Sequence, residues 1–217
     1  MLPTPIISAV HIAPLDVGHH VQVDRQMPVG AAILTATLQG SQVHFNLDSY
    51  ILRPSDPTDT LLLWLDRHVM RDGVTIAGYK LDDAVVLLDR LPGAEWSPVL
   101  GALAGCGQQH ALDMSARSGG EPVTFQQACA CSGILCAPVD ANRRFADWMR
   151  SDVRGLAHDA EVDALATFRL IIRRLAVLNP IARGIVGAIA DHFPAWLEQA
   201  DHPAAQAHVA DLLSVAD

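Results

Sequence analysis

The stretch "VGAAILTATLQGSQVHFNLDSYILRP", residues 29–54, decides the fold. It contains two runs with β-branched residues, "VGAAILTATL" and "VHFNLDSYILRP", which are joined by the turn "QGSQ" around Gly40. A glycine-containing turn between two such runs indicates a β-hairpin. The alternating run "AVHIAPLDV", residues 9–17, precedes the hairpin. We therefore predict that the chain begins with three antiparallel strands.

The remainder of the chain alternates between helix and strand and then becomes helical. The pattern predicts a helix over 60–70, a strand over 74–79, a helix over 83–91, a strand over 109–116 and helices over 124–134, 141–151, 155–178 and beyond 181. Strand–helix–strand units imply parallel neighbouring strands. The expected fold is therefore α/β, a mixed five-stranded sheet that is flanked by helices and followed by C-terminal helices.

The composition is that of a globular protein. Of the 217 residues half are hydrophobic and 18% are charged, and the formal net charge is −9. An acidic chain lacks the overall basic footprint of most nucleic-acid binders, although a site can be locally basic or can bind a polyanion through metal ions. No apolar stretch is long enough to cross a membrane, and the first residues do not resemble a signal peptide. We expect a cytoplasmic protein with no membrane partner.

The segment "HDAEVDA", residues 158–164, places a histidine and an acid near the start of the longest predicted helix. An aspartate such as Asp163 can hold a hard cation, and an imidazole such as that of His158 can accept a proton from water. The alternative is an amphipathic core helix in which both residues are incidental.

The same segment resembles the third motif of the DnaQ-like (DEDDh) 3′–5′ exonuclease superfamily, which reads H-x-A-x-x-D-A. His158, Ala160, Asp163 and Ala164 fit this pattern. The family has an RNase H-like fold: three antiparallel strands, then helix–strand–helix–strand, with the third motif on a late helix. The resemblance implies an RNase H-like exonuclease domain over residues 1–178, followed by a C-terminal helical extension over 179–217.

The chemistry that the resemblance implies is hydrolysis of phosphodiester bonds at single-stranded DNA or RNA ends by two Mg²⁺ or Mn²⁺ ions. Two cations stabilise the attacking and leaving oxygens and neutralise the phosphate. On this interpretation Asp163 is a metal ligand and His158 is the general base. Three arginines, Arg143, Arg144 and Arg154, would bind the substrate backbone, or else belong to a solvated helical face.

The first two family motifs match less closely. The first reads D-x-E on strand one, and "LDVG" places Asp16 at the aspartate and Gly18 at the glutamate. His19 and His20 follow, either as substitute ligands or as a polar loop. The second motif reads G-H-N-x-x-F-D, and "AGYKLDDAVV" offers Asp83, or Asp82, as its acid.

Other residues carry weaker signals. In the second motif Lys80, the only lysine of the chain, could occupy the space of a lost metal. Asp113 and Arg117 match a further family strand. The cysteines at 129, 131 and 136 fit no common zinc motif, and core packing is the alternative.

Two functions follow from these observations. The first is a metal-dependent 3′–5′ exonuclease, in which Asp16, Asp83, Asp163 and His158 would converge. The second is a catalytically degenerate exonuclease fold that serves as a nucleic-acid-binding or protein-assembly module, with its C-terminal helices free to pair with a second copy or a protein partner. The absent glutamate and the net charge of −9 favour the second, and the intact third motif favours the first.

Overall fold

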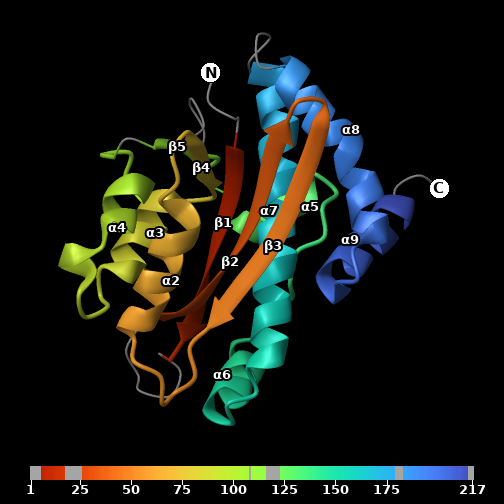
Figure 1. Cartoon of the computed structure of the whole chain (residues 1–217). Helices are drawn as coiled ribbons and strands as arrows, with labels where there is room; N and C mark the ends of the chain where they lie inside the picture. Colours follow the sequence, from red (N-terminus) through yellow and green to blue (C-terminus); the bar gives the residue numbers. More distant parts are fainter. Residues whose placement is uncertain (1–5, 18–25, 108, 116–122, 179–182, 215–217) are drawn as a thin grey trace.

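The computed structural model describes residues 6–17, 26–107, 109–115, 123–178 and 183–214. Its sheet (Figure 1) is made of β1 (Ile6–Asp16), β2 (Gln26–Gln39), β3 (Gln42–Ile51), β4 (Val74–Gly78) and β5 (His110–Asp113). The strand order is β3-β2-β1-β4-β5. Strands β1, β2 and β3 pair antiparallel, whereas β4 pairs parallel with both β1 and β5. The structure thus confirms the predicted mixed five-stranded sheet.

The helices also follow the predicted order, with two additions. They are α2 (Asp59–Val69), α3 (Leu81–Leu88), the 3₁₀ helix η1 (Ala94–Trp96), α4 (Pro98–Leu103), α5 (Phe125–Cys131), α6 (Ala141–Met149), α7 (Val153–Leu178), α8 (Arg183–Gln199) and α9 (Pro203–Ser214). The sequence pattern did not predict η1 and α4. With six residues α4 is too short to show a helical period, although Pro98 occupies a favourable first position.

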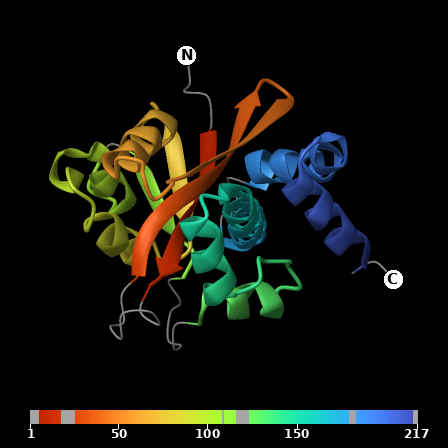
Figure 2. The ribbon, with the colours of Figure 1, turned by 90° about the horizontal axis from the view of Figure 1, so that it is seen from below.

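Helices cover both faces of the sheet. One apolar core lies between the sheet and α2, α3 and α4, and includes Val10, Ile33 and Leu65. A second core lies on the opposite face against α7, α8 and α9, and includes Ala9 and Phe168. Figure 2 shows these two helical layers with the sheet between them. Within the described ranges, no helix is long and apolar enough to cross a membrane.

Helix α7 lies against β1 through small side chains. Ala160 and Ala164 of α7 are buried with Ala13 of β1 and Ala32 of β2. Alanine has no side chain beyond Cβ, so the helix backbone can approach the strands closely without leaving a void. The two alanines of the "HDAEVDA" segment therefore have a packing role.

The C-terminal helices share the core of the sheet. Phe168 of α7 contacts Phe45 of β3 and Phe193 of α8, with ring centroids 6.0 and 5.1 Å apart. Residues 183–214 thus cover apolar surface of the segment that precedes them, and are not an isolated extension.

A buried polar network joins α7 to α9. Arg169 is 5% exposed, and its guanidinium donates to Asp211 and, over 3.0 Å, to Nδ1 of His208. Nε2 of His208 donates to the Val162 carbonyl over 3.0 Å. Burial lowers the pKa of His208 to about 4, so its ring is neutral and can accept from the arginine. The network therefore requires the Asp211 carboxylate to balance the buried charge of Arg169.

The substitution Asp211→Asn tests this network. We expect it to lower the free energy of unfolding by about 2–3 kcal/mol, because it leaves the buried Arg169 charge without a counter-charge. Urea unfolding followed by circular dichroism measures the loss. The control, Asp201→Asn, changes the same charge at an exposed position, where we expect a change within about 0.5 kcal/mol. Equal stability of both variants would contradict the role assigned to Asp211.

Candidate functional site

The residue of β1 that faces Asp163 is His11. Nε2 of His11 lies 3.5 Å from Oδ2 of Asp163. Alternate residues of a strand lie on one face, so Ala13 is the next β1 residue on the side of α7. Ala13 indeed packs against Ala160. On the side of β1 that faces Asp163, the strand therefore carries an imidazole, that of His11, and a methyl group, that of Ala13.

Asp163 is held in place by the protein itself. Its side chain is buried, and Oδ1 accepts a hydrogen bond from the backbone N–H of Ala137 over 2.8 Å. Ala137 lies between α5 and α6, so this bond fastens the connecting segment to α7. A buried N–H without a partner would cost about 1–3 kcal/mol, which gives Asp163 a structural role of its own.

Burial keeps both members of the His11–Asp163 contact close to neutral. It raises the pKa of Asp163 to about 7, against the opposing effects of the Ala137 N–H and the Arg144 charge. Burial, together with the smaller effect of the Arg144 charge, lowers the pKa of His11 to about 3. The distance alone would suggest an ion pair, but desolvation outweighs the attraction. At pH 7 the contact joins a neutral imidazole to a carboxyl group whose pKa lies close to the pH of the solution.

Two of the three predicted substrate arginines bind a buried acid instead. Asp159 of α7 is 5% exposed and accepts hydrogen bonds from Arg143 and from Nε of Arg144, the latter over 3.2 Å. Both arginines belong to α6, so Asp159 joins α6 to α7. The third, Arg154, is exposed near the start of α7, and makes no hydrogen bond or ion pair with the described part of the chain.

The other predicted metal ligands lie apart from Asp163. Asp16 ends β1 five residues after His11, which corresponds to roughly 16 Å along the strand. Asp83 is on α3, where its carboxylate is 73% exposed and pairs with Lys80 over 3.5 Å. Gly18, His19 and His20 lie outside the described residues. Among the residues that the structure does describe, no group of three or more His, Cys, Asp and Glu side chains could hold a metal ion.

His158 is also directed away from Asp163. It lies in the second turn of α7 and is half-buried. Five residues of helix correspond to a rotation of about 140° between the two side chains. The α7 residues that share a small cavity with His11 are instead Leu156, Asp159, Ala160 and Asp163. The structure therefore does not bring together the predicted base and the three predicted ligands.

The groups around Asp163 do not fit a pair of Mg²⁺ or Mn²⁺ ions. Such hard cations prefer several carboxylate or water oxygens. The groups that interact electrostatically with Asp163 are the His11 imidazole, the Arg144 charge, the thiols of Cys129 and Cys136, and the Asp159 carboxylate. Asp159 is itself paired with Arg143 and Arg144. Burial raises the pKa of both thiols, so they stay protonated. Cys131 and Cys106 are exposed.

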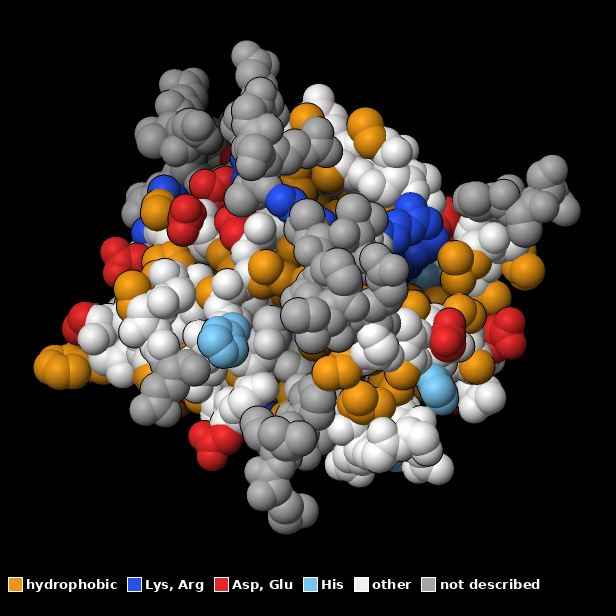
Figure 3. Space-filling model, turned by 90° about the horizontal axis from the view of Figure 1, so that it is seen from above, with side chains coloured by type: hydrophobic (Ala, Val, Ile, Leu, Met, Phe, Trp, Pro, Cys, Tyr) orange, Lys and Arg blue, Asp and Glu red, His pale blue; other side chains and the backbone are white. Residues whose placement is uncertain are grey.

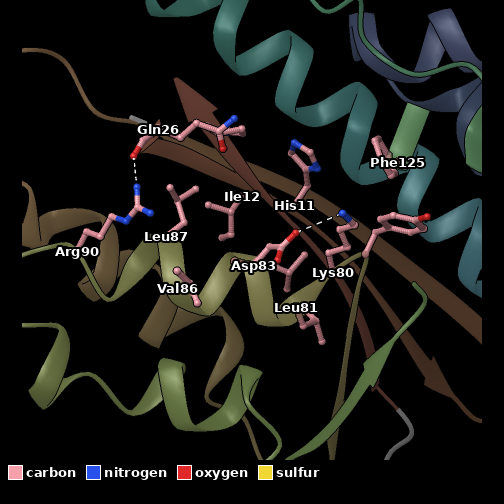
Figure 4. Close-up of a pocket in the computed structure, with 14 residues that line it drawn as sticks. His11, Ile12, Gln26, Lys80, Leu81, Asp83, Val86, Leu87, Arg90 and Phe125 are labelled. Atoms are coloured by element: carbon pink, nitrogen blue, oxygen red, sulfur yellow. Dashed lines mark hydrogen bonds and ion pairs between the residues drawn. The ribbon is translucent and has the colours of Figure 1, made fainter. Parts of the chain in front are cut away.

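A cleft of about 380 Å³ lies on the other side of His11, between β1 and α3. Figure 4 shows Lys80 and Phe125 at one end of the cleft and Arg90 with Gln26 at the other, with Ile12 and Leu87 between them. The ring of His11 lines both this cleft and the small cavity beside Asp163.

Asp113 fixes the turn that carries Lys80 into the cleft. Its two carboxylate oxygens accept the backbone N–H groups of Lys80 and Leu81, each over 3.0 Å. Oδ1 also accepts the N–H and the hydroxyl of Ser115, each over 2.7 Å. These bonds hold Lys80 in the left-handed region, at φ 55°, which costs a non-glycine residue about 1 kcal/mol. Asp113 thus fixes the backbone position of Lys80.

The sequence interpretation did not identify His11. No sequence signal marks it, because "HIA", residues 11–13, contains neither acid of the D-x-E motif. Comparisons with protein-family models, with curated proteins and with solved structures found no match.

The pKa shifts of His11 and Asp163 predict opposite effects on stability. Because the pKa of Asp163 is raised, the folded state keeps a proton that the unfolded state releases above pH 3.8. The contribution of Asp163 to the free energy of unfolding therefore falls as the pH rises to about 7. Because the pKa of His11 is lowered, the unfolded state binds a proton below pH 6.5 and the folded state does not. The contribution of His11 to the free energy of unfolding therefore falls as the pH drops towards 3. In the native protein the two effects offset each other between about pH 4 and 6.5.

The substitution Asp163→Asn should separate these effects, since an amide oxygen still accepts the Ala137 N–H but does not titrate. Relative to the native protein, we expect the variant to gain on the order of 2 kcal/mol of unfolding free energy as the pH rises from 4 to 7. Urea unfolding at several pH values measures the difference. A constant difference across this range would contradict the assigned pKa shift.

Proposed function

We propose that this chain is a metal-independent binding domain that does not hydrolyse nucleic acid, and that its ligand site is the cleft between β1 and α3. The observation that carries the proposal is the closed environment of Asp163. This carboxyl group accepts the Ala137 N–H and faces His11, and it has no neighbouring carboxylate free to share a metal ion among the described residues.

The roles of the third-motif residues in the fold support the proposal. Ala160 and Ala164 pack α7 against the sheet, and Asp163 binds the segment between α5 and α6. These roles account for three of the four motif residues without a metal, and His158 is the exception. The presence of these residues on α7 therefore does not require catalysis.

The charges of the molecule support the proposal as well. The two arginines of α6 pair with Asp159, so they do not form a track for a phosphodiester backbone. On the face seen in Figure 3, acidic, basic and apolar side chains are interspersed. The competing proposal is the metal-dependent 3′–5′ exonuclease acting on single-stranded DNA or RNA, which the resemblance of "HDAEVDA" favours.

A degradation assay separates the two proposals. The native protein is incubated at high concentration with 5′-labelled single-stranded DNA or RNA, first with Mg²⁺ and then with Mn²⁺. We expect no shortening of either strand by the native protein, and the same result with Asp163→Asn. Stepwise shortening by the native protein that is lost in Asp163→Asn would overturn the binding-domain proposal and establish the exonuclease.

A further inference from the structure

The cleft between β1 and α3 is an elongated groove. Lys80 precedes α3 and Arg90 follows it in the sequence, and the eight residues of α3 span about 12 Å. The floor is formed by β1 from Val10 to Pro14, which covers roughly 13 Å of strand. The volume of about 380 Å³ lies within the range of small-molecule sites.

The walls of this groove are mainly apolar, and one end is aromatic. Val10, Ile12 and Leu87 are among the lining residues, and Ile12 and Leu87 lie in the middle of the groove (Figure 4). At the Lys80 end, the Phe125 ring lies 5.5 Å from the Tyr79 ring and 5.7 Å from the His11 ring. Flat aromatic groups pack well against such rings in edge-to-face or offset arrangements. The groove therefore favours a ligand with a flat apolar body.

The charged groups of the groove favour an anion. Among its described lining residues, Lys80 and Arg90 are cationic and only Asp83 is acidic, within a chain of net charge −9. The pKa of His11 is low enough that its ring adds no charge at pH 7. The Lys80–Asp83 pair is exposed and 3.5 Å long, so it contributes little. An incoming anion can replace the Asp83 carboxylate beside the ammonium group.

We propose that the groove binds a small aromatic anion, whose anionic group contacts Lys80 and whose ring lies over Ile12 and Leu87 beside Phe125. The inference rests on the proposed function, in which this cleft binds without hydrolysing. A carboxylate and a phosphate monoester share the required chemistry. A nucleotide fits less well, because its sugar and base edges need polar partners that the middle of the groove does not supply.

Calorimetric titration with matched probes tests the proposal. The probes are 2-naphthoate, 2-naphthyl phosphate, the uncharged 2-naphthol and uridine monophosphate. We expect one site per chain for the two naphthyl anions, with Kd values of about 10 μM to 1 mM, and at least tenfold weaker binding of 2-naphthol. The tighter of the two anions identifies the carboxylate or the phosphate class. Tighter binding of uridine monophosphate than of either naphthyl anion would overturn the assigned ligand class.

Two variants locate the site. Lys80→Met should weaken both naphthyl anions at least tenfold and leave 2-naphthol unchanged, whereas Arg67→Met, which removes an exposed charge from α2, should change neither. Ala84→Phe, which fills the groove from α3, should abolish binding of all naphthyl probes in a protein whose circular dichroism is native. Unchanged binding in Lys80→Met and Ala84→Phe would overturn the proposal.

The single lysine of the chain provides a readout that needs no variant. Reductive methylation of the native protein, followed by mass spectrometry of the Lys80 peptide, should slow at least threefold in saturating 2-naphthoate and remain unaffected by 2-naphthol. Equal rates with and without 2-naphthoate would overturn the proposed contact.

The outcomes distinguish this inference from the function on which it rests. Absence of binding together with an intact 2-naphthyl phosphate would overturn the inference and leave the non-hydrolysing domain standing. Release of 2-naphthol from 2-naphthyl phosphate, lost in the Lys80→Met variant, would instead contradict the proposed function.

Discussion

The close approach of α7 to β1 is the constraint on which the rest of this structure depends. Ala160 and Ala164 lie against Ala13 and Ala32, and little space is left between helix and sheet. Polar groups in such a contact must find partners inside the protein, because water cannot reach them. His11 and the Ala137 N–H meet this requirement for Asp163, and Arg143 and Arg144 meet it for Asp159.

This close packing gives the residues of the third motif a structural role as an alternative to a catalytic one. An alanine–aspartate–alanine pattern on a helix suits a metal site, but it equally suits a helix that packs tightly on a strand and binds a neighbouring loop. Sequence resemblance cannot separate these roles, because the same side chains serve both. The decisive residues are the partners across the interface, and here the strand contributes His11 and Ala13.

The sequence predicted the elements whose signals are local. The hairpin around Gly40 follows from alternation and a glycine turn, and Gly40 indeed has φ +63°. The order of helices and strands follows in the same way, apart from α4, whose six residues show no period. The partners of Asp159 could not be predicted, because Arg143 and Arg144 have other acids close to them in the sequence, at positions 140, 147 and 152. The contact between His11 and Asp163 joins residues about 150 positions apart, and only the tertiary structure specifies it.

The dry interface around Asp163 also bears on how a nuclease could arise from this fold. Carboxylates at positions 11 and 13 would supply the acids that a metal pair requires. They would also add two negative charges beside Asp163, at positions whose present side chains are neutral and largely withdrawn from water. Unbalanced charges there would oppose folding until cations bound. In such a descendant the metal would be needed first to complete the folded protein, and only then to act on a substrate.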